Sequence, residues 1–382
     1  MKIQDQYDLN IYIDSLNIFE ANGVILVAAE ITEAISNPVP QCKLCLTVPL
    51  DWLDERSIVD GTLIRFEIKN KDLDINENLR FRLFKINKVE IQQKTVKIEL
   101  SGLLDFYRGY ESGNEYNMFA PTSEVFKHIA RVNKLTAEID DTNDEQLWVA
   151  GENNTYQFMM KMATHGWIDE TSAMFWCMDR HGILLYKDLT RLFAKRSSHI
   201  GKFIQQIYTD PSEKVYGYSA ADASIQAGYE NIVNGGYGGE DHFFNLLDYD
   251  LTPVNAKKVV AFSNLINIGK ELSHGLAQSF YPLDVGNFHK NYYRAKKQNT
   301  RILSTFSTYV NVATTFFMPY RLAQIINFEH IDSQDPNNKV KLTSGLFTIC
   351  AIKINMTTKD ITCFLQLAMQ GLNGKAITRE VY

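Results

Sequence analysis

The sequence has 382 residues, 45% hydrophobic and 22% charged, a composition typical of a folded protein with a large core. At this length, two or more domains are expected. The net charge is −6 and the Lys and Arg residues form no cluster. Because holding DNA requires many cations, we expect no specific nucleic-acid binding.

The N-terminal residues 1–6 lack the charged start and apolar core of a signal peptide. No stretch approaches the ~20 apolar residues that span a bilayer. We therefore expect a soluble chain made in the cytoplasm, with no stable membrane insertion.

The first ~110 residues are predicted to form antiparallel β structure. Apolar and polar residues alternate at 9–14, 64–69 and 95–100. Each of these strands would have one apolar face and one polar face. This pattern is typical of a sheet or barrel with one wet side.

Residues from about 115 to 195 are predicted to form a small α+β unit. Helix-start signals stand at Pro121-Thr122-Ser123 and Asn153-Asn154-Thr155, each followed by apolar residues at helical spacing. Strand-like runs cover 135–139, 173–178 and 183–186, with a turn at His181-Gly182.

The β pattern returns at about 213 and is interrupted at about 245–300, where we expect an insertion with a short helix near 265–276. The predicted class is α+β and β-rich, with two similar antiparallel β-barrel domains. The expected boundaries are 1–112 (first barrel), 113–200 (α+β domain), 201–245 with 301–370 (second barrel), 246–300 (inserted domain) and 371–382 (C-terminal tail).

A hairpin pattern occurs near each end of the chain. The first copy has Phe84-x-Ile86-x-x-Val89-x-Ile91, a turn, and Val96-x-Ile98-x-Leu100; the second has Phe347-x-Ile349-x-x-Ile352-x-Ile354, a turn, and Ile361-x-Cys363-x-Leu365. In both first strands the alternation slips by one residue at the same place, which predicts a β-bulge. Two interpretations are open: a chance match, or a duplicated barrel with which three chains would present six similar barrels around one axis.

The five cysteines are scattered, and the spacing of Cys42 and Cys45 on a predicted strand puts them on opposite faces. This geometry suits neither a zinc knuckle nor a redox pair, so a structural role is favoured. Three other stretches resemble sites and are interpreted as loops: Glu240-Asp241-His242, the glycine run 235–239, and the acidic segment 140–145. We predict no catalytic, cofactor-binding or metal residue, although a pair of catalytic carboxylates among the 45 acidic residues is not excluded by sequence.

Aromatic residues gather in the α+β unit, at Trp148, Trp167 and Phe175-Trp176. They predict either a platform for a partner or a sugar, or a core between helices and strands. The core is the favoured interpretation.

The α+β unit resembles that of the baseplate hub proteins of contractile phage tails. Late control protein D and the hub region of type VI secretion spike proteins are similar. The resemblance rests on 123–130, 135–139, 153–159, 162–167 and the strands 175–179 and 182–185, and the C-terminal hairpin from 341 to 367 is also similar to the last barrel strands of that family. The order of the parts carries more weight than any one motif.

The resemblance implies a non-enzymatic virion structural protein, assembled into the tail baseplate in the host bacterial cytoplasm. Its homotrimer would form a pseudo-sixfold ring that joins the hexameric tail tube to the central spike and forms part of the DNA passage for ejection. Implied partners are the central spike protein, the tail tube or tube-initiator protein, other baseplate proteins and the tape measure protein, and no cofactor is implied. Because the sequence ends soon after the second predicted barrel, the spike is expected to be a separate protein.

Three rival functions remain open from the sequence. The chain would be the hub-like part of a host-binding or cell-wall-degrading protein of a non-contractile tail, a glycan hydrolase, or a carbohydrate-binding module. A neighbouring receptor-binding gene, release of sugar from cell wall, and glycan binding by a monomer would favour them in turn.

Overall fold

The computed structural model describes residues 2–3, 7–54, 58–71, 74–110, 116–169, 172–194, 201–205, 213–225, 239–245, 250–255, 277–283, 289, 291–292, 295, 308–314, 320–330 and 344–369. Several expectations from the sequence lie outside these residues. They concern most of the glycine run, the short helix near 265–276 and the tail 371–382.

The first β unit is an antiparallel sheet with one buried face. Its main strands, in order across the sheet, are β2 (Tyr7–Ile13), β6 (Leu63–Asn70), β7 (Ile75–Gln92), β8 (Thr95–Leu104), β5 (Asn37–Pro49) and β4 (Ile25–Ala34). The short elements β1 (Lys2–Ile3), β3 (Leu16–Asn17) and α1 (Leu50–Asp54) lie at its margins. The predicted alternation is confirmed, since Leu9, Phe66 and Ile98 and their same-face neighbours are buried.

The α+β unit follows and contains both predicted helices. Its elements are α2 (Tyr107–Tyr110), β9 (Met118–Ala120), α3 (Thr122–Val132), β10 (Ala137–Ile139), β11 (Gln146–Trp148), α4 (Thr155–Ala163), β12 (Met174–Met178), β13 (Leu184–Asp188) and α5 (Leu189–Ala194). Helix α4 begins where predicted, because Asn154 and Gln157 form a reciprocal capping box. No helix within the described ranges is long and apolar enough to cross a membrane.

The second β unit contains β16 (Ala220–Ile225), β20 (Thr308–Thr314), β23 (Ile361–Met369), β22 (Gly345–Met356), β21 (Ile325–Phe328), β14 (Lys202–Gln205) and β15 (Val215–Tyr218). A separate three-stranded sheet is formed by β17 (Gly239–Asn245), β18 (Asp250–Asn255) and β19 (Ala277–Leu283). Glu240, Asp241 and His242 therefore lie in strand β17, and their prediction as a loop was wrong. Backbone pairing with β18 and β19 on both sides holds these residues in a strand.

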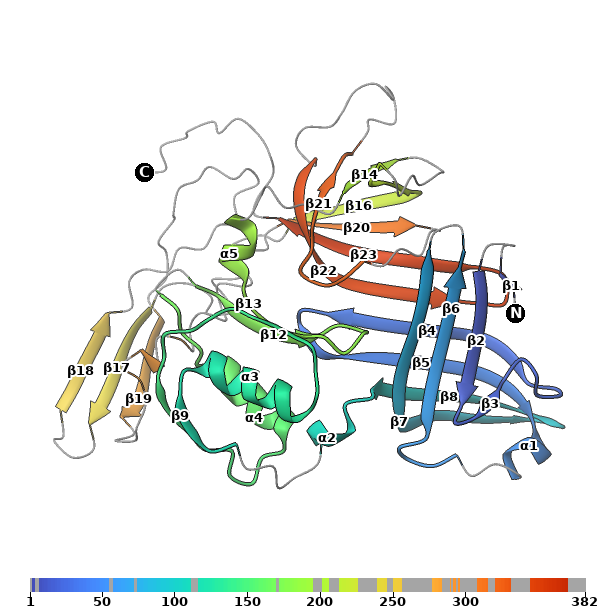
Figure 1. The fold of residues 1–382 in the computed structure, drawn as a ribbon, viewed down its shortest axis with the longest axis horizontal. Helices are drawn as coiled ribbons and strands as arrows, with labels where there is room; N and C mark the ends of the chain where they lie inside the picture. The colour runs from blue at the N-terminus through green and yellow to red at the C-terminus, as the bar shows by residue number, and fades with distance from the viewer. Residues whose placement is uncertain are drawn as a thin grey trace.

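The two β units are joined edge to edge. Strand β4 pairs antiparallel with β22, so that the described strands of both units form one 15-stranded sheet (Figure 1). The β-rich α+β class is confirmed. The expected barrels differ in one respect: the strand path is not closed among the described residues, because β4 pairs with the other unit rather than with β2.

Candidate functional site

The two β units repeat the same strand order. In the first unit the order is β6-β7-β8-β5-β4, and in the second it is β21-β22-β23-β20-β16, with antiparallel pairing throughout. The corresponding strands also follow each other along the chain in the same order, which is β4, β5, β6, β7, β8 in the first unit and β16, β20, β21, β22, β23 in the second. Five strands thus repeat both their order across the sheet and their order along the chain. This favours a duplicated unit over a chance match of two hairpins.

Both bulges predicted from the hairpin pattern are confirmed. The register of β7 with β8 shifts between Ile86 and Lys88, and that of β22 with β23 shifts between Ile349 and Ala351. The second strands correspond with an offset of two residues from the sequence alignment, since Ile354 pairs with Cys363, not Ile361, as Ile91 pairs with Val96. The second hairpin has one more residue pair before its turn than the first, which explains the offset.

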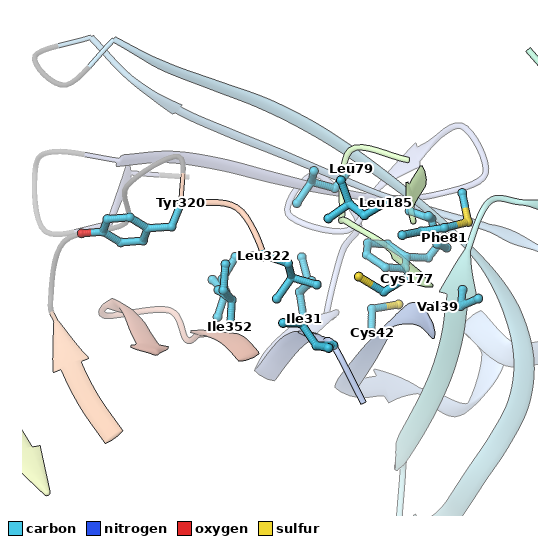
Figure 2. Close-up of a cluster of buried hydrophobic side chains, with 14 of the residues drawn as sticks. Ile31, Val39, Cys42, Leu79, Phe81, Cys177, Leu185, Tyr320, Leu322 and Ile352 are labelled. Carbon is cyan, nitrogen blue, oxygen red and sulfur yellow. The ribbon is translucent and has the colours of Figure 1, made fainter. Parts of the chain in front are cut away.

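The joint between the units is closed by a buried apolar cluster (Figure 2). Ile31 of β4 and Ile352 of β22 lie close to Leu322, which precedes β21. The same cluster continues through side chains of the first β unit and of the β12–β13 hairpin; these are Val39, Cys42, Leu79, Phe81, Cys177 and Leu185. The α+β unit is thus packed against the joint rather than attached only by its chain ends.

An ionic cluster is buried at the same joint. Arg180, at the turn between β12 and β13, lies with both carboxylates of its cluster in the interior. Its Nη1 donates to Glu33 Oε1 at 2.6 Å and to the Tyr320 carbonyl at 2.5 Å, and its Nη2 lies 3.7 Å from Glu77 Oε1. Glu33 belongs to β4 and Glu77 to β7, both in the first β unit, and Tyr320 lies before β21 of the second β unit. Because Arg180 itself belongs to the α+β unit, its guanidinium links all three units.

The charges of this cluster depend on one another. Burial raises the pKa of Glu33, and the Arg180 charge opposes that rise. Burial alone would lower the pKa of Arg180, but Glu33 and Glu77 outweigh it and raise the pKa. The guanidinium therefore stays charged and holds its carboxylates in place. This geometry fits a structural role, because the Arg180 side chain contacts groups of both β units from its own place in the α+β unit.

One apolar stripe is left uncovered. In the outer half of β7, the exposed fractions of Ile86, Val89 and Ile91 are 44%, 56% and 70%. Their counterparts in β22 are Ile349, Ile352 and Ile354, which are 0%, 1% and 0% exposed. The two strands have the same pattern of residues, and only the second is covered.

The aromatic and acidic stretches of the α+β unit have structural roles. Trp148, Trp167, Phe175 and Trp176 are buried, which confirms the core interpretation. In the acidic segment, Asp144 accepts bonds from the backbone N–H of Thr122 at 2.8 Å and of Trp167 at 2.8 Å, and so caps the start of α3. Among the described residues, no group of three or more His, Cys, Asp and Glu is placed to hold a metal ion.

The cysteines give a direct test of the interior. Cys42, Cys177, Cys350 and Cys363 are buried, and Cys45 is half-buried on the other face of β5. Burial raises the pKa of Cys363 to about 12, and it also raises the pKa of the other three buried thiols. We expect a thiol reagent at pH 8 to label only Cys45 in the native protein and all five cysteines after denaturation. Rapid labelling of two or more thiols in the native protein would contradict this packing.

No protein-family model matches the sequence, and no curated protein sequence matches it. Solved structures do. A tail protein from Neisseria meningitidis MC58 matches 96% of this chain over 98% of its own length, with a TM-score of 0.56 and 10% identity. The 43 kDa tail protein of prophage MuSo2 from Shewanella oneidensis matches 95% of this chain over 97% of its own length, with a TM-score of 0.56 and 9% identity.

The chain has the fold of phage tail proteins. The resemblance to phage tail proteins seen in the sequence is thereby confirmed at the level of the fold. Both tail proteins are matched over nearly their whole length, so the shared fold includes both β units and the α+β unit.

Proposed function

We propose that this protein is a structural hub of a phage tail baseplate, and that three copies form a ring of six β units. The observation that carries the proposal is the repeated strand order, β6-β7-β8-β5-β4 and β21-β22-β23-β20-β16, within one chain. Three chains with two equivalent units each would match a sixfold tube on one side and a threefold spike on the other.

In this role the chain is a virion component of a contractile tail and acts mechanically rather than as an enzyme. It binds the central spike protein, the tail tube or tube-initiator protein, other baseplate proteins and the tape measure protein, and its ring encloses part of the path for DNA ejection. The buried cluster around Arg180 supports the mechanical role, because it fastens the α+β unit to the joint between the two β units.

Native mass spectrometry of the purified chain at high concentration tests the proposal. We expect a particle of three times the chain mass of 43.8 kDa. Negative-stain images of the same sample should show rings with a central opening. A monomer at every concentration, alone and with a spike protein added, would overturn the proposal.

A further inference from the structure

Among the described strands, the outer half of β7 pairs with β8 alone, whereas its counterpart in β22 is paired on both sides. Strand β7 pairs with β6 from Ile75 to Arg82 and with β8 on its other side. Strand β22 likewise pairs with β21 at 345–348, but its outer half, Ala351–Met356, pairs with β4. Within the part of the chain that the structure describes, no strand takes the place of β4 beside β7.

The face presented there belongs to the core. Ile86, Val89 and Ile91 lie opposite three β8 residues that are buried; these are Leu100, Ile98 and Val96. The stripe is therefore a continuation of the buried face of the sheet past the last covering element. An edge strand with an exposed apolar face pairs readily with another strand.

The matching free edge lies in the second unit. The strand order places β16 where the first unit has β4, at the outer side of β20. Strand β4 uses its outer edge to pair with β22, whereas β16 pairs only with β20 among the described strands. Among the described strands, one pair of edges (β4 with the outer half of β22) is thus joined, and the equivalent pair (β16 and the outer half of β7) is not.

We infer that β16 of one copy pairs antiparallel with the outer half of β7 in the next copy. This inference rests on the proposed ring and names the contact that closes it. The contact is head-to-tail, and with three copies it repeats between chains the β4–β22 joint that exists within each chain. Six joints of one kind would then make the sheet continuous around the axis.

The register of the new pair follows from the old one. In the existing joint Ile31 lies opposite Ile354. The bulges of β7 and β22 align the two units, and Ile91 of β7 then takes the position of Ile354 of β22. Following the paired residues across each sheet from there, Ile225 of β16 takes the position of Ile31 of β4. Ile225 of one copy should therefore lie opposite Ile91 of the next.

A disulfide tests this register in the full chain. We expect the double variant Ile91→Cys with Ile225→Cys to give, on mild oxidation, a covalent species of three chains on a denaturing gel. The control is Ile91→Cys with Ala221→Cys, which moves one thiol by four residues. At ~3.3 Å per residue this is a shift of about 13 Å, too far for a disulfide. Neither the Ile91→Cys single variant nor the control pair should link the chains.

The outcomes separate this inference from the proposed function. Rings that form normally in native mass spectra, but in which the double variant Ile91→Cys with Ile225→Cys does not cross-link, would overturn the strand pairing and leave the hub. Equal cross-linking of the control pair would overturn the register. Absence of the three-chain particle already in the native protein would overturn both. A three-chain particle of the Ile91→Cys single variant shows that this substitution leaves folding and assembly intact.

Discussion

Replacing Arg180 with methionine is expected to lower the free energy of unfolding by about 3–5 kcal/mol, because the carboxylates of Glu33 and Glu77 would be left buried without their cation. Chemical denaturation followed by circular dichroism measures the change. The effect should be large because the guanidinium contacts both β units, through Glu33 and Glu77 of the first and the carbonyl of Tyr320 before β21 of the second.

The matched control is an ion pair across the same joint on its solvent side. Lys353 Nζ lies 2.7 Å from Glu30 Oε2, and both side chains are partly exposed. Lys353→Met should change the free energy of unfolding by no more than about 1 kcal/mol. Equal stability of the Arg180→Met variant and the native protein would show that the buried cluster does not fasten the joint.

Placing aspartate at two equivalent positions is expected to separate folding from assembly. Ile354→Asp buries an unpaired charge and should cost on the order of 4 kcal/mol or more, enough to prevent the chain from folding. Ile91→Asp changes a residue that is 70% exposed and should alter the stability of the monomer by only about 0.5 kcal/mol.

The two variants need two readouts. Ile354→Asp should be lost from the soluble fraction, whereas Ile91→Asp should be soluble, show a native circular dichroism spectrum and run as a monomer. The apolar edge of β7 is then no longer able to pair with a neighbouring chain. An Ile91→Asp protein that still assembles into three-chain particles would contradict a role for this stripe.

Many of the strands were predictable from the sequence, because apolar and polar residues alternate along a strand that is buried on one face. Leu9, Phe66 and Ile98 show this, and the one-residue slips at Ile86 and Ile349 predicted the two bulges. The helix starts were predictable for a local reason as well, since the capping box of Asn154 and Gln157 is written within four residues.

The joint was not predictable, because the pairing of Ile31 with Ile354 leaves no periodic mark in either strand. Arg180 and Glu33 are 147 residues apart, so no spacing rule connects them. The sequence did contain one signal. Ala29, Ile31 and Glu33 are alternate residues of β4 on its buried face, and a buried carboxylate needs a buried partner.

The uncovered stripe is a different case. The sequence patterns of 84–91 and 347–354 are nearly the same, and both predict a buried face. Whether such a face is covered depends on its neighbours in the fold. In the second unit Ile31 of β4 and Leu322 lie beside Ile352, and in our proposal another molecule takes the equivalent place beside β7. A sequence pattern identifies a face that requires covering, but it does not say which chain covers it.

Electron cryomicroscopy of the assembled particle tests the central claim most directly. Averages down the particle axis should show a closed ring with threefold symmetry and a strong sixfold component at the radius of the β units, with density continuous between β16 and β7 of adjacent chains. A threefold particle without the sixfold component, or a field of single chains, would contradict the account of this protein as a hub built from a duplicated β unit.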